Sequence, residues 1–305
     1  MHLYQPMTPL LRTTTFGLIA AVCIASMGAA QAPATDDQSR QIVAEEFVSK
    51  RPAGGRKTAA TARYKPAKGS KAVAGGEARL GLTIWRLRPA KGQQPDDARL
   101  LVQEGGAETA WVAEHVDADA PLDVGDRVRL SFESARAGYL YVIDREQYAD
   151  GTASEPYLIF PTSRTRGGDN RVEAGRLVEV PDQADRPNYF SVRRSRPDQV
   201  AEALTVIVAP QPLDGLMPSG GARKLAAADV ARWEKEWGSA VEQFALEGGA
   251  ARPWTMPEQR AGVDGSRLLT QDDPPPQTVF RLKSAPGAPV LVTVRLPYGA
   301  GAPRP

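Results

Sequence analysis

Short apolar runs with a period of two dominate the middle of this 305-residue chain, and they constrain its fold more than any other feature. Leu80, Leu82 and Ile84 alternate with other residues, and the same pattern recurs over residues 127–133. Such alternation is typical of β-strands that bury one face. Further short runs, separated by Gly, Pro and Asp, lie at 139–143, 157–160, 177–180, 189–192 and 204–208. The spacing predicts a mainly β fold, an antiparallel β-sandwich or barrel-like body, rather than alternating βαβ units.

One helix is predicted late in the chain. Val230, Trp233, Trp237, Val241 and Phe244 recur at steps of three and four, which predicts one long amphipathic helix that ends at Gly248-Gly249. Two strands at 279–282 and 290–296 then flank a turn at 285–287 and predict a closing hairpin. We therefore expect a single β-rich domain over 79–305, with its core at 80–213 and the helix and closing hairpin at 214–298.

The first residues have the features of a secretory signal. Residues 13–35 carry no charge, and their strongly apolar part, 16–27, is too short to span a bilayer comfortably. Small residues follow, which predicts a signal peptide at 1–32 that is cleaved after Ala30 or Ala32. We expect an exported protein, periplasmic or extracellular, without a transmembrane segment after cleavage. The alternative is an uncleaved signal that anchors the chain in the inner membrane.

A basic stretch follows the predicted signal. Between residues 50 and 71 there are eight basic residues and no acidic one, set among Pro, Gly, Ala and Ser. They are Lys50, Arg51, Arg56, Lys57, Arg63, Lys65, Lys68 and Lys71. Such a composition buries too little apolar area to offset chain entropy, so it predicts a basic flexible linker over 33–78. This tether is either a solvated spacer or an attachment to an anionic envelope surface.

The composition excludes several kinds of chemistry. The chain has two His and one Cys, and removal of the predicted signal leaves His115 alone. A disulfide framework, a Cys nucleophile and a Cys/His zinc site are therefore excluded in the mature protein. His115 lies in an acidic stretch that predicts a solvated loop, which argues against a Ser-His-Asp triad. The net charge of +2 argues against a nucleic-acid partner, and we expect neither a metal nor a cofactor.

The richest polar constellation is the loop at 162–171. Its candidate ligand-binding residues are Arg164, Arg166, Gly167, Gly168, Asp169, Asn170 and Arg171. The glycines let backbone N–H groups converge on an anion, and arginines bind carboxylate or phosphate through paired hydrogen bonds. The alternative is ordinary turn chemistry, in which Gly supplies an unusual φ and Asp and Asn bond to their own backbone.

Two further groups of residues are candidate sites. Trp254 lies in a stretch without periodicity and is a candidate exposed aromatic contact. Asp144, Glu146 and Asp150 lie between two predicted strands, but their spacing does not match a calcium loop and predicts a solvated hairpin.

Several strings resemble a known family. They lie at 121–130, 138–144, 157–161, 169–172 and 174–175, and the first reads PLDVGDRVRL. Together they resemble the bacterial envelope family called domain of unknown function 4384, over roughly residues 80–213. Later segments around Trp233, around Trp254 and at 269–274 resemble an extension in some members. The resemblance implies a β-rich domain that is exported or appended to other modules, and it supplies no catalytic residues.

These observations favour an exported, non-catalytic binding or scaffolding module of the bacterial cell envelope. Its loops would recognise another envelope protein or an anionic polymer. The alternative is a carboxylate-based hydrolase that acts on envelope glycans, because Asp and Glu are the only catalytic acids and bases in good supply. Such an enzyme needs two carboxyl groups roughly 5–10 Å apart across a deep cleft.

Overall fold

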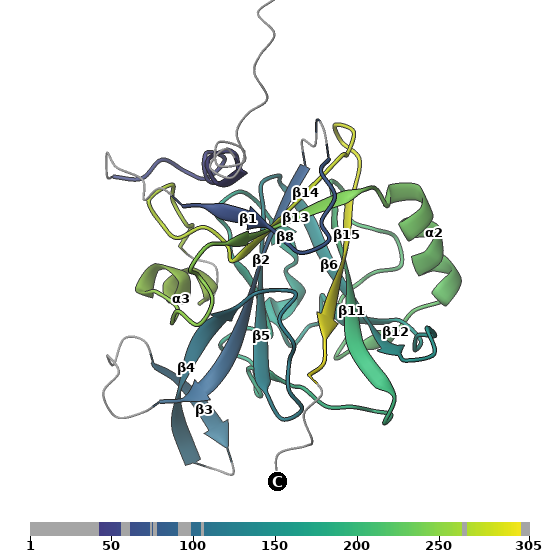
Figure 1. Ribbon diagram of the computed structural model, residues 1–305, viewed down its shortest axis with the longest axis horizontal. Coiled ribbons are helices and arrows are strands. Elements are labelled where there is room, and N and C mark those ends of the chain that lie inside the picture. Colours follow the sequence, from purple (N-terminus) through teal and green to yellow (C-terminus); the bar gives the residue numbers. More distant parts are fainter. Residues whose placement is uncertain are drawn as a thin grey trace, which may run out of the picture. The chain divides into compact units, whose positions relative to one another are not determined.

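Two antiparallel β-sheets pack face to face and enclose the main hydrophobic core (Figure 1). The computed structural model describes residues 43–55, 62–73, 75, 78–90, 99–104, 107–263 and 267–299. Of the two predicted architectures, the sandwich is therefore the one observed. The predicted signal at 1–32 lies outside the described residues, and no helix among those residues has the length and apolar character needed to cross a membrane.

The first sheet has nine strands in the described part of the chain. Its order is β1-β13-β14-β2-β4-β3, and β5 pairs with β2, β9 and β10. The strands are β1 (Tyr64–Pro66), β2 (Ala78–Pro89), β3 (Arg99–Glu104), β4 (Ala107–Val116), β5 (Arg127–Ser134), β9 (Val178–Val180), β10 (Phe190–Ser191), β13 (Val241–Leu246) and β14 (Thr278–Leu282). The predicted runs at 80–84 and 128–132 form the centre of this sheet.

The second sheet has six described strands in the order β12-β7-β6-β11-β15, with β8 paired to β6. They are β6 (Gly138–Tyr148), β7 (Tyr157–Phe160), β8 (Arg171–Val172), β11 (Gln199–Ala209), β12 (Arg223–Lys224) and β15 (Val290–Pro297). The core between the sheets includes Leu82 and Phe132 from the first and Val142 and Val206 from the second, all fully buried. Burial of each such side chain stabilises the fold by roughly 1.5–3 kcal/mol.

The predicted long helix is shorter than expected. Helix α2 (Ala227–Trp237) packs Val230 and Trp233 on the outer face of the second sheet (Figure 1). The helix ends at Gly238, whose backbone is extended (φ −64°, ψ 137°) and whose N–H donates to the Glu234 carbonyl. A Cβ at Gly238 would lie 2.1 Å from that carbonyl oxygen, so the chain leaves the helix where only glycine fits. The prediction that Val241 and Phe244 continue the helix is wrong, because both lie in β13.

The predicted closing hairpin is also wrong. Strand β14 pairs with β13 and β2 in the first sheet, whereas β15 pairs with β11 in the second. Strand β14 thus lies inside its sheet, with a hydrogen-bonded neighbour on each edge. The turn at 285–287 therefore connects the two sheets rather than two paired strands.

The prediction of a flexible linker over 33–78 is wrong where the structure describes this segment. Residues 43–48 form a helix, and its Val43 and Phe47 pack with Tyr64, Phe244 and Val279 in a satellite core. Strand β1 pairs with β13 through all three of its residues. Apolar side chains set between the basic ones therefore attach the segment to the sheet.

The basic residues of this segment divide into three groups. Arg51 is 3% exposed and is therefore a buried residue of the folded domain. Lys50, Arg63, Lys65, Lys68 and Lys71 are exposed, as predicted for a solvated surface. Arg56 and Lys57 lie outside the described residues.

Candidate functional site

A cleft of about 440 Å³ lies where the loop after β7 meets the loop after β9 and the end of α3 (Met256–Gly262). It is lined by Arg164, Arg166, Gly167, Asp169, Asp182, Ala184, Asp185 and Val263. Four of the seven candidate residues of the predicted loop thus line one cleft. Of the other three, Gly168 is buried, the Asn170 amide donates to the Leu140 carbonyl at 2.9 Å, and Arg171 pairs with Asp169.

The backbone of this loop makes a left-handed turn. Arg166, Gly167 and Gly168 have φ of 54°, 63° and 89°, and the short helix η2 (Arg166–Gly168) spans them. Gly168 packs against Pro218 so closely that a Cβ would lie 2.7 Å from the proline ring. A non-glycine residue in this region costs of order 1 kcal/mol or more, and such strain tends to occur at functional positions. The cost falls on Arg166, one of the two arginines in the cleft.

The positive charge of Arg166 is only partly offset by its surroundings. Its Nη1 donates to the Leu177 carbonyl at 3.2 Å, which is its one hydrogen bond within the described residues. Burial lowers the pKa of the Arg166 guanidinium and the nearby cation of Arg176 lowers it further, while the carboxylates of Asp169, Asp182 and Glu179 raise it. Arg164 is exposed and makes no polar contact with the described residues. An anion in the cleft would therefore stabilise both arginines.

The carboxylates of the cleft mainly hold the loops in place. Arg171 donates to Asp169 from Nε at 2.9 Å, and these hydrogen bonds lower the pKa of Asp169 to about 2. Asp185 Oδ2 accepts from Thr165 Oγ1 at 2.6 Å and so joins the two loops. Asp182 Oδ1 accepts from the Ala184 N–H at 2.9 Å. Within the described residues, no three His, Cys, Asp or Glu side chains form a group that could hold a metal ion.

A buried ion pair lies next to the cleft residues. Arg129 on β5 donates through Nη2 to the Glu179 carboxylate on β9, and both side chains are 0% exposed. Burial raises the pKa of Glu179, and the nearby carboxylate of Asp182 raises it further. Helix α3 covers this pair, because a Cβ on Gly262 would lie 2.3 Å from the Glu179 carboxyl carbon. The same helix ends at Val263, on the rim of the cleft.

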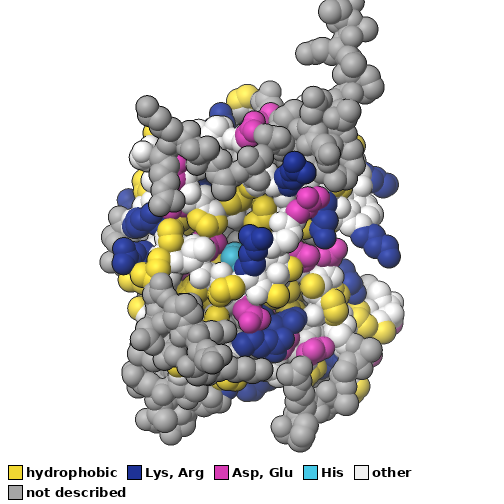
Figure 2. Space-filling model, turned by 60° about the vertical axis from the view of Figure 1, so that its left-hand side comes forward, with side chains coloured by type: hydrophobic (Ala, Val, Ile, Leu, Met, Phe, Trp, Pro, Cys, Tyr) yellow, Lys and Arg dark blue, Asp and Glu magenta, His cyan; other side chains and the backbone are white. Residues whose placement is uncertain are grey.

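Helix α3 is attached to the first sheet through His115. His115 lies in β4 and is 6% exposed, and its ring centroid lies 4.3 Å from that of Trp85 with the ring planes tilted by 49°. Its Nε2 lies 3.1 Å from Glu258 Oε1 on α3, and its Nδ1 lies 2.9 Å from the Arg252 carbonyl. Figure 2 shows only a small area of histidine among hydrophobic and basic side chains on this face. The prediction of a solvated loop at His115 is wrong, because residues 251–254 hydrogen-bond along the edge of β4 and lead into α3, whose Glu258 contacts the His115 ring.

The prediction of an exposed aromatic contact at Trp254 is wrong for the same reason. Its side chain is 3% exposed and meets the Trp85 ring edge-on at 6.0 Å. The Arg129 guanidinium lies 5.7 Å from its ring. Trp254 is thus a core residue in the segment that leads into α3.

The acidic residues Asp144, Glu146 and Asp150 do not form one solvated hairpin. Asp150 is exposed and accepts from the Thr152 N–H at 2.9 Å, as a turn residue does. Asp144 instead shares the inner face of the second sheet with Glu146 and Glu202. Burial, together with the neighbouring carboxylates of Glu202 and Glu146, raises the pKa of Asp144 to about 8. Neither described cleft is lined by these three carboxylates.

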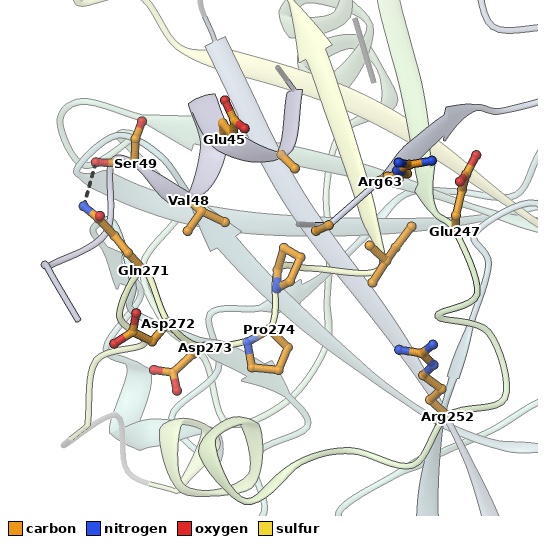
Figure 3. Close-up of a pocket in the computed structure, with 14 residues that line it drawn as sticks. Glu45, Val48, Ser49, Arg63, Glu247, Arg252, Gln271, Asp272, Asp273 and Pro274 are labelled. Atoms are coloured by element: carbon orange, nitrogen blue, oxygen red, sulfur yellow. Dashed lines mark hydrogen bonds between the residues drawn. The ribbon is translucent and has the colours of Figure 1, made fainter. Parts of the chain in front are cut away.

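A larger groove of about 650 Å³ lies between the helical residues 43–48, the segment 246–252 and the segment 271–275 (Figure 3). Its polar walls are occupied by contacts within the fold. Gln271 Nε2 donates to the Ser49 carbonyl at 3.4 Å, and the Pro274 carbonyl accepts from Arg51 at 3.1 Å. Asp273 accepts from Arg267. We interpret this groove as the seam where the N-terminal segment joins the sheet, and the arginine-lined cleft as the candidate site.

The loop at 162–171 was recognisable from its composition, but the other wall of the cleft was not. Asp182 and Asp185 lie in a Pro- and Asp-containing segment that carries no ligand motif. Thr255 and Glu258 have the spacing of a capping box, a readable signal for the start of α3. No family model, curated protein or solved structure matches this chain, so the interpretation of the cleft depends on its own geometry.

Proposed function

We propose that the protein is an exported binding module of the bacterial cell envelope, which recognises an anionic group on an envelope protein or polymer through the cleft at Arg164 and Arg166. The single observation that carries the proposal is the state of Arg166. A half-buried guanidinium lines the cleft with one hydrogen bond to the described part of the chain, in a strained backbone conformation. The signal-like leader and the resemblance to envelope proteins support export.

Arginine is suited to this role because its planar guanidinium offers paired N–H groups to a carboxylate or phosphate. Arg164 and Arg166 belong to one loop and line one cleft. Hydrogen bonds to charged groups are each worth about 1.5–3 kcal/mol. The sandwich and the buried Arg129–Glu179 pair give this loop a rigid support.

The hydrolase hypothesis has one observation in its favour. Asp169 and Asp182 line the same cleft, and their pKa values move in opposite directions, as an acid and a base require. Hydrogen bonds from Arg171 lower the pKa of Asp169, and burial raises that of Asp182. However, Arg171 occupies both oxygens of Asp169, and Asp182 Oδ2 is sealed from solvent. Binding is therefore the better-supported function.

The test is capture from an envelope extract by the immobilised full-length protein and by a double variant, Arg164→Ala with Arg166→Asn. Asparagine tolerates the left-handed backbone, so this variant removes the charge without new strain. We expect the double variant to lose the salt-sensitive partners that the wild type captures. Arg232→Ala, an exposed arginine on α2, serves as the matched control. Capture of the same partners by the double variant, at the same salt concentration, would exclude the cleft as the binding site.

A further inference from the structure

We infer that the anion recognised by this cleft is the carboxylate of a peptide, either a free C-terminus or an acidic side chain. This inference rests on the proposed function and narrows its ligand. It excludes phosphate-bearing polymers as the preferred partner. Three features of the cleft support this inference: its charge, its free hydrogen-bonding groups and its apolar rim.

The charge of the cleft disfavours a doubly charged anion. Two arginines and three aspartates line it. Asp169 is neutralised from outside the cleft by Arg171 at 2.9 Å and by Arg176 at 3.8 Å. The remaining charged residues of the lining, Arg164, Arg166, Asp182 and Asp185, sum to a net charge of about zero. A phosphate monoester carries about −1.5 to −2 at neutral pH and would be repelled by the two remaining carboxylates, whereas a carboxylate brings one charge.

The geometry provides one acceptor beside the two arginines. Asp185 Oδ2 accepts from Thr165 Oγ1 and from the Asp182 N–H, at 2.6 and 2.9 Å. Its Oδ1 accepts no hydrogen bond from the described residues, although the side chain lines the cleft. This free acceptor beside the anion site can bind an N–H donor of the same ligand. A peptide supplies such a donor one or two bonds from its terminal carboxylate, and a phosphate diester backbone does not.

The rim of the cleft is apolar. Val263 is 46% exposed, one of the most exposed large hydrophobic side chains in the described part of the chain, and Ala184 also lines the cleft. A peptide ligand would place a small apolar side chain between them. The expected ligand is therefore a carboxylate with an adjacent backbone N–H and a small hydrophobic side chain.

The test is isothermal titration of the full-length protein with five small probes. They are N-acetyl-Ala-Ala, its C-terminal amide, N-acetyl-glutamate amide, glucuronate and inorganic phosphate. We expect at least one peptide carboxylate to bind about tenfold or more tightly than phosphate. The first and third probes distinguish a terminal carboxylate from a side-chain carboxylate, and the uncharged amide should not bind. Arg164→Ala with Arg166→Asn should abolish binding, and Asp185→Asn, which keeps an oxygen for Thr165, should reduce discrimination against phosphate.

The outcomes separate this inference from the proposed function. Tighter binding of phosphate than of either peptide carboxylate would overturn the inference and leave an anion-binding module intact. Equal binding of glucuronate and the peptide carboxylates would overturn the assignment to peptides. Failure of every probe, together with capture from the extract that does not depend on the two arginines, would overturn both.

Discussion

Three carboxylates meet on the inner face of the second sheet without a basic partner. Glu202 on β11 lies directly opposite Glu146 on β6, and Asp144 is two residues along the same strand. No Lys or Arg among the described residues forms a salt bridge with any of them. Tyr298 Oη and Gln199 Nε2 donate to Glu202 Oε1, at 2.5 and 2.9 Å. The cluster is therefore stabilised by protonation of its carboxyl groups rather than by neighbouring cations.

The stability of the protein should consequently fall as the pH rises from the acid range to about 8, and should level off above that value. Burial and the carboxylates of Glu202 and Glu146 raise the pKa of Asp144 from 3.8 to about 8. Since the folded-state value exceeds the unfolded one, the stabilisation is complete at acid pH and is lost as the pH approaches about 8. Between pH 6 and pH 9 the free energy of unfolding should decrease by about 2–3 kcal/mol.

Urea unfolding at pH 6, 7.5 and 9 measures this dependence. Asp144→Asn keeps a hydrogen bond to Glu202 without a titrating proton, so its unfolding free energy should vary less over this range. Asp214→Asn, at an exposed position in the loop after β11, should leave the slope unchanged. A wild type whose stability is the same at pH 6 and pH 9 would contradict the account.

A single buried arginine fixes the N-terminal segment. Arg51 Nε and Nη2 each donate to the Glu133 carboxylate at 2.7 Å, and the two side chains are 3% and 2% exposed. Arg51→Ala would leave the Glu133 charge buried without its partner, at a cost of about 3–5 kcal/mol. Urea unfolding measures this loss. Lys50→Ala, at the exposed neighbouring position, should change stability by less than about 0.5 kcal/mol, and an equal effect of both variants would refute the ion-pair explanation.

At the scale of elements, helix α3 depends on one side chain. It has seven residues, too few to be stable alone. Glu258 Oε2 accepts from the Thr255 N–H at 2.8 Å, and Oε1 lies 3.1 Å from His115 Nε2. Glu258→Ala removes both the cap and the link to the sheet, which together should cost about 2–4 kcal/mol.

Hydrogen exchange provides the local readout for this variant. Amides of residues 256–263 should lose protection in Glu258→Ala, while those of β6 and β11 keep theirs. Glu236→Ala, at an exposed position on α2, is the control. Unchanged protection of α3 in Glu258→Ala would show that packing over Trp254 holds the helix without this link.

Alternation along a strand predicted the strands but not what covers them. Leu82 and Trp85 fall on opposite faces of β2 as expected, in the main core and in a second cluster with Trp254. On β5, however, Arg129 and Glu133 occupy positions that read as a solvated face, and both are buried. Their partners come from segments 50 and 82 residues away, and no local pattern encodes such pairings.

The same limit applies to the cleft. Arginines and glycines of the 162–171 loop were identifiable because their chemistry is contained in one segment. The opposite wall, Asp182 to Asp185, meets that loop through the bond between Thr165 and Asp185. The position of this wall follows from the pairing of β5 with β9, which is a tertiary contact that no local pattern encodes.

At the scale of the whole molecule, the segment at 43–73 completes the sandwich. Phe47 and Tyr64 cover Phe244 and Val279, which are 2% and 0% exposed, and β1 occupies the edge of β13. The Tyr64 hydroxyl donates to the Pro276 carbonyl at 2.5 Å. Without this segment the first sheet would have an apolar patch, a free edge and an unpaired Glu133.

A chain that begins at residue 79 should therefore fail to fold as a compact sandwich, whereas one that begins at residue 43 should fold. Each lost aromatic contact is worth about 1.5–3 kcal/mol, and the broken ion pair about 3–5 kcal/mol. Their sum is comparable to the roughly 5–15 kcal/mol that stabilises a whole domain. Thermal unfolding followed by circular dichroism, with a hydrophobic dye as a second probe, compares the two chains. Equal melting temperatures would mean that the segment is a detachable tether, and binding experiments on a chain from residue 79 would then be valid.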